Sequence, residues 1–325
     1  MLRRGRIVAD PVSIFEGDLT MFLRSVAATG VLALTAGASA ALTVTIENDP
    51  IVLAPATLSA GSGITIVSGS ETLIGGDAQQ GTYTGFNQTS NSSDPNLSLT
   101  DGVVLTSGLG TFNTTENTSN SASTSTSTGS YQPLVDLAAA GGLNQNQNDS
   151  NVLSFEFTLD DPTENSVSAQ FIFATDEFPT QGVTDIMGIF VNGVNYAFFP
   201  NGDLVSNQSG DPNDFFNLNP VGTDATNGYG LEWNGLTDVF NVIMLANGGG
   251  AVNTIDIAIA DTSDTIFDSA LFFTNLTAGT TTGGGGIGDD PGDPPDGYIP
   301  VPASMPLLLA GLGAFGLLRR RKTRN

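Results

Sequence analysis

The sequence predicts an all-β protein built as a β-sandwich of jelly-roll or lectin-like type, with one or two short helices. Three observations predict it. Short apolar segments recur between turn signals, and helix-forming residues are scarce beside abundant Gly, Thr, Ser, Asn and Val. No rhythm of strands alternating with helices appears, so a parallel α/β sheet is not expected. Residues 41–278 carry these patterns and suffice for one large β domain or two small ones.

The expected strands are short, and most are joined by short turns. Each has alternating apolar residues or a short apolar run bounded by turn-forming residues. They are residues 42–46, 63–67, 103–105, 152–159, 167–173, 187–191, 194–199, 239–245, 254–260 and 269–274. Asn192-Gly193 lies between two of them and is a strong signal for a tight hairpin turn.

Two segments interrupt the series of strands. Residues 133–140 predict a short helix, because Pro133 suits the first helical turn. Residues 113–130 read NTTENTSNSASTSTSTGS, a polar run of low complexity. We expect this run to be a mobile insertion between early strands.

The N-terminal residues 1–40 predict a secretory signal peptide with an extended basic region. Arg24 precedes the apolar residues 26–36, and Ala38-Ser39-Ala40 forms an A-x-A cleavage signal. Cleavage between Ala40 and Ala41 is therefore expected. The alternative is a membrane-spanning N-terminal helix, although two Gly residues interrupt this short apolar stretch.

The C-terminal residues predict a spacer followed by a membrane helix. Residues 279–298 are rich in Gly, Pro and Asp, so we expect a flexible acidic linker. Residues 301–318 carry no charge, and at about 1.5 Å per residue they reach roughly 27 Å, enough to cross a hydrocarbon core. A basic cluster follows and is expected to stay cytoplasmic; it contains Arg319, Arg320 and Arg321.

The charge distribution is strongly asymmetric. The chain has 9 Lys and Arg against 33 Asp and Glu, with no His and no Cys. No Lys or Arg lies between Arg24 and Arg319, whereas 30 of the acids do, so this part has a net charge of −30. Such a polyanion cannot neutralise phosphates, which excludes nucleic acid as a partner. The missing His and Cys exclude disulfides and zinc–thiolate sites, and the remaining oxygen ligands suit calcium or magnesium.

Two acidic groups are candidate calcium ligands. They are Asp176, Glu177 and Asp185 after the fifth expected strand, and Asp261, Asp264 and Asp268 after the ninth. Calcium takes six to eight oxygens, and no cationic side chain of this domain could compensate clustered carboxylates. The alternative is that these residues form Asx turns and caps in ordinary loops. A third group, Asp211 and Asp214, is a weaker candidate.

Paired carboxylates also leave an enzymatic alternative, a glycoside hydrolase that would use Asp176, Glu177 and Asp185. One carboxyl would have to be kept protonated next to apolar or aromatic groups. Sugar sites commonly stack on aromatic rings, and the chain has one Trp, Trp233, and five Tyr. We therefore do not expect an enzyme.

The C-terminal segment resembles a bacterial sorting signal. Ile299-Pro300-Val301-Pro302-Ala303, the apolar stretch and the Arg cluster are similar to the VPLPA-type, PEP-C-terminal-like signal of Gram-negative bacteria. Ile and Val replace two residues of that pattern. The resemblance implies export, transient anchoring in the inner membrane, and processing near the Pro-Ala motif by an exosortase-type protease. A plain single-span anchor is the alternative.

Most of residues 50–275 resemble the choice-of-anchor L domain of bacterial surface proteins. The resemblance rests on SGITIVSGS, LTDGVVLTSGLG, SFEFTL, FIFATDEF, MGIFVNG and IAIADTSDTIFDSALFF. The family usually has Ser-Glu-Glu-Tyr where this chain has Thr175-Asp176-Glu177-Phe178, which keeps both acids and an aromatic ring. The resemblance implies a secreted, surface-displayed β domain and no established catalytic activity.

These observations predict an exported, non-catalytic domain at the cell surface or in the extracellular matrix of a Gram-negative bacterium. We expect it to be stabilised by calcium and to contribute to adhesion or biofilm, with extracellular polysaccharide or surface proteins as partners. A structural envelope scaffold without a specific ligand is the alternative, because a binding face on a β-sandwich has no required motif.

Overall fold

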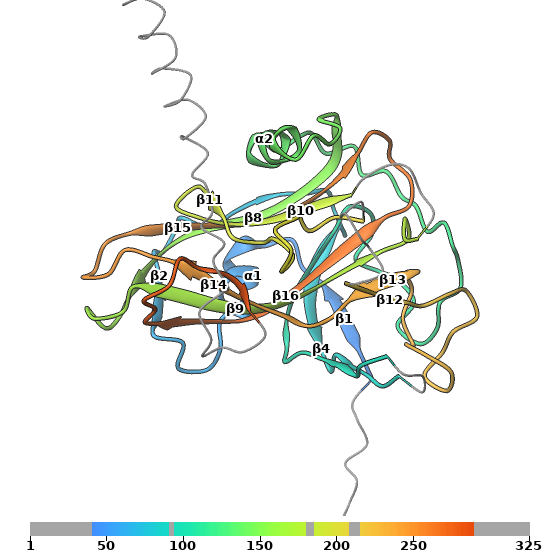
Figure 1. Cartoon of the computed structure of the whole chain (residues 1–325), viewed down its shortest axis with the longest axis horizontal. Helices are drawn as coiled ribbons and strands as arrows, with labels where there is room; N and C mark the ends of the chain where they lie inside the picture. The colour runs from blue at the N-terminus through green and yellow to red at the C-terminus, as the bar shows by residue number, and fades with distance from the viewer. Residues whose placement is uncertain (1–40, 91–93, 180–184, 208–214, 289–325) are drawn as a thin grey trace, which may run out of the picture. The chain divides into compact units, whose positions relative to one another are not determined.

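The computed structural model describes residues 41–90, 94–179, 185–207 and 215–288, which belong to one compact unit (Figure 1). The expected signal peptide, the third acidic group, residues 289–298 of the linker and the sorting signal lie outside them. Within the described ranges, no helix is long and apolar enough to cross a membrane.

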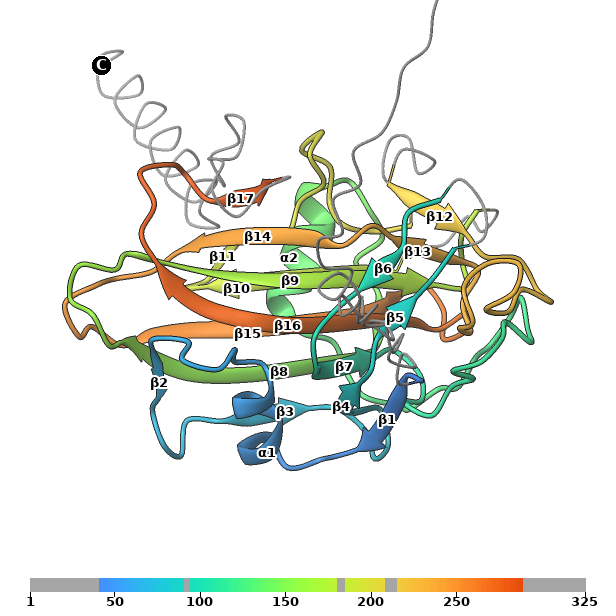
Figure 2. The ribbon, with the colours of Figure 1, turned by 90° about the horizontal axis from the view of Figure 1, so that it is seen from below.

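Two antiparallel sheets face one another, so the predicted all-β class is confirmed (Figures 1 and 2). The nine-stranded sheet has the order β1 (Thr43–Ile46), β4 (Gln80–Thr84), β7 (Gly102–Thr106), β16 (Ser269–Gly279), β9 (Ser166–Thr175), β13 (Gly235–Thr237) and β12 (Phe216–Leu218), and β14 (Phe240–Leu245) joins β9 to β17 (Gly286–Gly288). The six-stranded sheet has the order β11 (Val194–Asn195), β10 (Ile186–Val191), β15 (Asn253–Thr262), β8 (Gln147–Leu159) and β2 (Ile64–Ile66), with β3 (Thr72–Ile74) also on β8. A small ribbon pairs β5 (Asn87–Gln88) with β6 (Leu97–Ser98).

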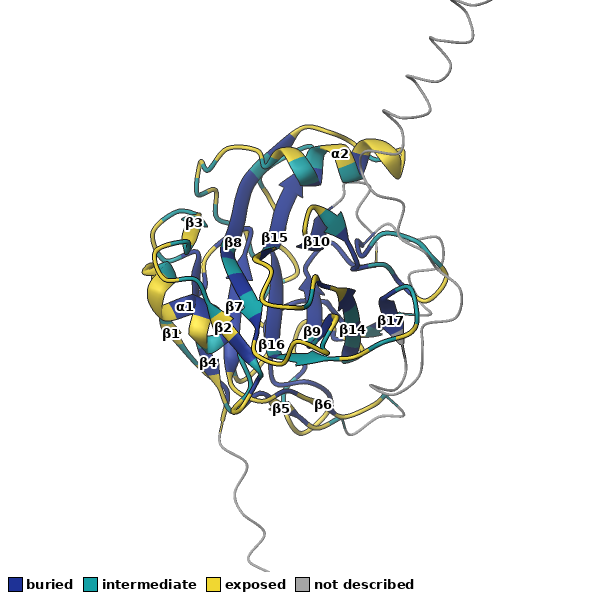
Figure 3. Ribbon diagram, turned by 90° about the vertical axis from the view of Figure 1, so that its left-hand side faces the viewer, coloured by how far each residue is buried: buried dark blue, intermediate teal, exposed yellow. Residues whose placement is uncertain are grey.

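The main core lies between the two sheets, where alternate side chains of facing strands meet. Phe171 and Phe173 of β9 face the interior from one sheet, and Ile257 of β15 faces it from the other. A second cluster on the other face of the nine-stranded sheet contains Phe272 and Trp233. The strands are therefore largely buried, whereas exposed residues gather in loops and helices (Figure 3).

Two short helices cover parts of the sandwich, within the expected number. The predicted helix at 133–140 is confirmed as α2 (Gln132–Ala140), whose Leu134 packs on the outer face of the six-stranded sheet. The other helix is α1 (Pro50–Ala56), capped by Asp49, whose side chain accepts from the backbone N–H of Ile51 at 2.9 Å.

The predicted hairpin turn between β10 and β11 is confirmed. Asn192 and Gly193 have φ values of +52° and +77°. A tight turn of this kind needs both central residues in the left-handed region, which Asn and Gly tolerate best.

Two segments differ from what their composition suggested. Residues 113–130 are held against the domain by backbone hydrogen bonds to buried carboxylates and are called the strap below. The nine-stranded sheet also extends into the expected linker, residues 279–298. There β17 pairs with β14, and Ile287 of β17 is buried.

Candidate metal centre

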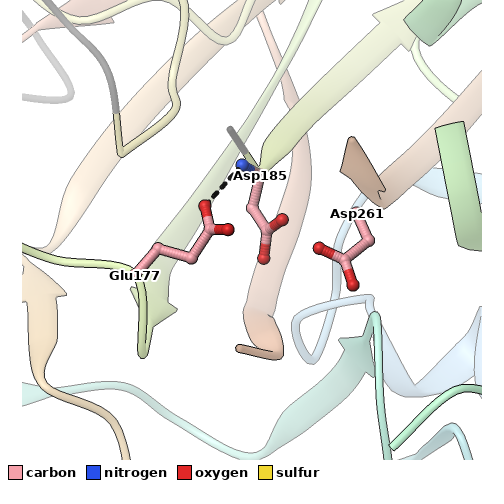
Figure 4. Close-up of side chains that lie close together, drawn as sticks. All are labelled: Glu177, Asp185 and Asp261. Carbon is pink, nitrogen blue, oxygen red and sulfur yellow. Dashed lines mark hydrogen bonds between the residues drawn. The ribbon is translucent and has the colours of Figure 1, made fainter. Parts of the chain in front are cut away.

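Three carboxylates meet at one end of the apolar core, and we call Glu177, Asp185 and Asp261 the carboxylate centre. One carboxylate oxygen from each of the three residues lies within 4.8 Å of those from the other two. Their side chains point toward one another in Figure 4. Oxygens bound to one calcium ion lie within roughly 5 Å of each other, because each stands 2.3–2.6 Å from the ion. The spacing therefore suits a shared cation.

The strand pattern explains why these three residues meet. In a strand every second side chain faces the same way. Asp261 continues the inward series of Ile257 and Ile259 on β15, and Asp185 continues that of Met187 on β10. Ile186 pairs with Ala260, so Asp185 and Asp261 are the next residues of the same ladder. Glu177 extends the inward series of β9 from the opposite sheet, two residues beyond the strand.

The carboxylate centre is buried and incompletely hydrogen bonded. Glu177, Asp185 and Asp261 are 1%, 0% and 0% exposed. Among the described residues, no hydrogen-bond partner reaches Glu177 Oε1, Asp185 Oδ1 or either oxygen of Asp261. Buried polar atoms nearly always have partners, and ionised ones need them most. These oxygens therefore lack a donor or a cation.

A few neutral groups do contact the carboxylate centre. The backbone N–H of Asp185 donates to Glu177 Oε2 at 3.0 Å and to Asn207 Oδ1 at 2.9 Å. The Ser269 hydroxyl donates to Asp185 Oδ2. Asp185 and Asp261 are also close enough to share a proton when one of them is protonated. When both are ionised, no donor from the described parts of the chain reaches Asp261.

Burial raises the pKa values of all three carboxyls. It raises the pKa of Glu177 to about 10 and that of Asp261 to about 8, and the pKa of Asp185 lies well above its usual range. The neighbouring negative charges raise them further. Because no Lys, Arg or His lies between Arg24 and Arg319, none of the described residues can supply a compensating positive charge. Either protons or a bound cation must neutralise the carboxylate centre.

The other three predicted ligands lie beside the carboxylate centre and not in it. Asp264 is half-buried, and its charge acts on Glu177 and Asp261. Asp176 Oδ2 accepts from the backbone N–H of Ala122 at 2.7 Å, and its Oδ1 accepts from that of Asn234 at 3.0 Å.

Asp268 behaves like Asp176. Its Oδ1 accepts from the backbone N–H of Thr124 at 3.0 Å. Burial raises the pKa values of Asp176 and Asp268 to about 7, and backbone hydrogen bonds oppose the rise. Both residues therefore hold the strap.

Sequence reasoning missed several residues of this region. Asn207 and Ser269 contact the carboxylate centre, and Asp149 and Glu232 hold the strap. Period-two counting from the apolar positions would have singled out the three central acids. No local pattern marks Asp149 or Glu232, because their partners lie 22 and 113 residues away in the sequence.

Comparison with known proteins gives one match. Curated proteins and solved structures show none. The family model described as the choice-of-anchor L domain matches residues 51–277, which include the carboxylate centre and the strap. This range covers more than half of the chain. The chain belongs to the choice-of-anchor L domain family.

Proposed function

We propose that this chain is an exported domain, stabilised by calcium, that acts in adhesion, in a biofilm or in the extracellular matrix. Its family indicates a surface-associated, non-enzymatic protein. The finer function rests on one observation. A fully buried set of three carboxylates has four unpartnered oxygens and no cationic side chain in the described parts of the domain.

Calcium fits the carboxylate centre better than magnesium does. Burying an ionised carboxylate costs several kcal/mol unless a cation compensates it. Calcium accepts six to eight oxygens in flexible geometry, whereas magnesium demands an octahedron and keeps several waters. Glu177, Asp185 and Asp261 would supply the charged ligands. The side chain of Asn207 would supply a neutral oxygen close by.

The burial of the same residues counts against the glycoside hydrolase alternative. A retaining hydrolase holds its two carboxyl groups about 5–5.5 Å apart, so spacing alone does not exclude one. A sugar must, however, reach both groups, and Glu177 and Asp185 are 1% and 0% exposed. A neutralising role explains their burial, and a catalytic role does not.

Export and display at the surface remain part of the proposal. The predicted cleavage between Ala40 and Ala41, and the sorting motif with Pro300, Pro302 and Ala303, support it. An exosortase-type protease would process the precursor, which the C-terminal helix would hold in the inner membrane. Extracellular polysaccharide or other surface proteins would then be the partners.

Thermal unfolding tests the calcium part of the proposal. The full chain, purified in mild detergent, is melted with calcium, with magnesium and with a chelator at one ionic strength. We expect a calcium-specific rise in melting temperature, because only the native state assembles the carboxylate centre. Equal curves in all three solutions would contradict calcium binding.

A deletion strain tests the role at the surface. We expect weaker attachment and lower matrix retention, restored by the wild-type gene. Unchanged attachment and retention would favour the alternative of a structural envelope scaffold without a specific ligand.

A further inference from the structure

We infer that calcium at the carboxylate centre controls the docking of the strap, residues 113–130. The strap is docked against the domain when the ion is bound and is released when the ion is absent. This inference rests on the calcium site of the proposed function. It adds a regulated segment to that site.

Residues 118–127 of the strap are attached mainly through their backbone, and their acceptors are buried acids. The acceptors are 1–8% exposed and come from separate parts of the chain: Asp149, Asp176, Glu232 and Asp268. The backbone N–H groups that donate to them are those of Thr118, Ser119, Ala122, Thr124, Thr126 and Ser127, with distances of 2.7–3.2 Å. A segment rich in Ser, Thr and Asn, without an apolar core, is thus ordered by carboxylate acceptors.

Two of these acceptors are joined directly to the carboxylate centre. Asp176 precedes Glu177 in the chain. Asp268 precedes Ser269, whose hydroxyl donates to Asp185. The loop that follows β15, the strand that carries Asp261, ends at Asp268. Any movement of the centre therefore displaces the residues that hold the middle of the strap.

The strap and this loop are also bound to each other. The backbone N–H of Asp268 donates to the carbonyl of Ala122 at 2.8 Å, and that of Asp176 donates to the carbonyl of Asp268 at 3.2 Å. The backbone N–H of Phe267 donates to the Ser123 hydroxyl at 2.7 Å. Hydrogen bonds therefore join the strap, the loop and the end of β9 into one network beside the carboxylate centre.

Electrostatics gives the direction of the coupling. The strap offers only neutral donors, while its acceptors add negative charge to that of the carboxylate centre; the charge of Asp268 acts on both Asp185 and Asp261. A bound divalent cation lowers this repulsion and fixes the loop. Without it the acids separate, and the strap loses its aligned acceptors.

The protein contains its own reporter of the docked state. Trp233 is the only Trp of the chain and is 2% exposed. It packs against Phe112, with ring centroids 4.1 Å apart and ring planes tilted by 55°. Trp233 also lines a cleft of about 240 Å³ together with Thr118 and Ser119 of the strap. Release of the strap should expose the indole and shift its emission to longer wavelength.

Hydrogen exchange of the strap amides, read by mass spectrometry on the full chain, tests the inference. With calcium we expect protection at residues 118–127. With chelator we expect exchange at least tenfold faster there, together with a red shift of Trp233 emission, while β8 and β15 stay protected. If calcium raises the melting temperature but strap exchange does not change, the coupling is wrong and the calcium site stands. If neither changes, the proposed function fails as well.

A variant measured in saturating calcium covers the case in which the chelated protein unfolds. Glu232→Gln weakens a strap acceptor that does not belong to the carboxylate centre. Coupling between two equilibria is reciprocal, so a looser strap must weaken calcium binding. We expect faster exchange at residues 118–127 and a severalfold higher calcium Kd. Asp136→Asn, an exposed acid on α2, is the matched control and should change neither. An unchanged Kd with a loosened strap would overturn the inference.

Discussion

Replacing Asp261 by Asn removes one negative charge from the carboxylate centre with little change in size. Asp261 is fully buried, and neither of its oxygens has a hydrogen-bond partner within the part of the chain that the structure describes. Burial raises its pKa from 3.8 to about 8. Each pKa unit corresponds to about 1.4 kcal/mol, so ionised Asp261 destabilises the metal-free protein at pH 8 by on the order of 5 kcal/mol.

The variant should therefore be more stable than the wild type in chelator, and calcium should stabilise it much less than it stabilises the wild type. For a domain of this size 1 kcal/mol shifts the melting temperature by roughly 2–4 °C, so we expect a rise of about 10–20 °C in chelator. In calcium the wild type gains about 4 kcal/mol at a thousandfold excess over Kd. Asp261→Asn lacks one charged ligand and should therefore lose most of this stabilisation by calcium.

Calorimetric melting at pH 8 measures both differences. The wild type, Asp261→Asn and the control Asp136→Asn are compared in chelator and in calcium at equal ionic strength. The control should follow the wild type, because Asp136 is exposed on α2. A variant that is less stable than the wild type in chelator, and that gains as much from calcium, would refute the reasoning.

Two further predictions concern the strap and the pH dependence. Gly108→Ala should lower the melting temperature, because the new Cβ would stand 1.7 Å from Asp268 Oδ2 and displace an acceptor of the strap; we expect a cost of about 1–3 kcal/mol. Gly129→Ala in the strap itself meets nothing within 4 Å and should cost nothing, so equal losses in the two variants would contradict this account. In chelator the free energy of unfolding should fall as pH rises from about 4 to about 10, since the carboxylate centre has raised pKa values and the unfolded chain ionises first. In saturating calcium the free energy of unfolding should instead rise with pH on the acidic side, where protons compete with the ion for the carboxylates. Denaturant titrations at several pH values in both solutions measure this. The same dependence of the free energy of unfolding on pH in the two solutions would mean that no ion is bound.

Local patterns predicted the strands that build the main core. Period-two alternation marked residues 152–159 and 167–173, which lie within β8 and β9. It could not predict that β8 begins earlier, at Gln147, because those residues are polar. Short strands such as β13 and β17 carry too few residues for a pattern, and their pairing with β9 and β14 supplies the missing hydrogen bonds.

The candidate site was predictable in composition and only partly in geometry. Acid density singled out six residues, of which the structure brings Glu177, Asp185 and Asp261 together. Asp176 differs from Glu177 by one position and therefore faces the other way, toward the strap. The sequence could not predict that the strap is held against the domain. Its polar composition predicts a mobile segment, and the carboxylates that fix it come from strands and loops distant in the sequence.

The pairing of β17 bears on how the domain would respond to mechanical force. Within the described residues β17 is the last element before the C-terminal segment, and it pairs only with β14, through three residues. A load applied from that end reaches this short strand first and the eleven-residue β16 only afterwards. The strand should peel away under weak tension and expose Ile287, while the longer ladder between β9 and β16 still carries the load. Under force applied from the C-terminal end, the domain would lengthen at β17 before its core yields.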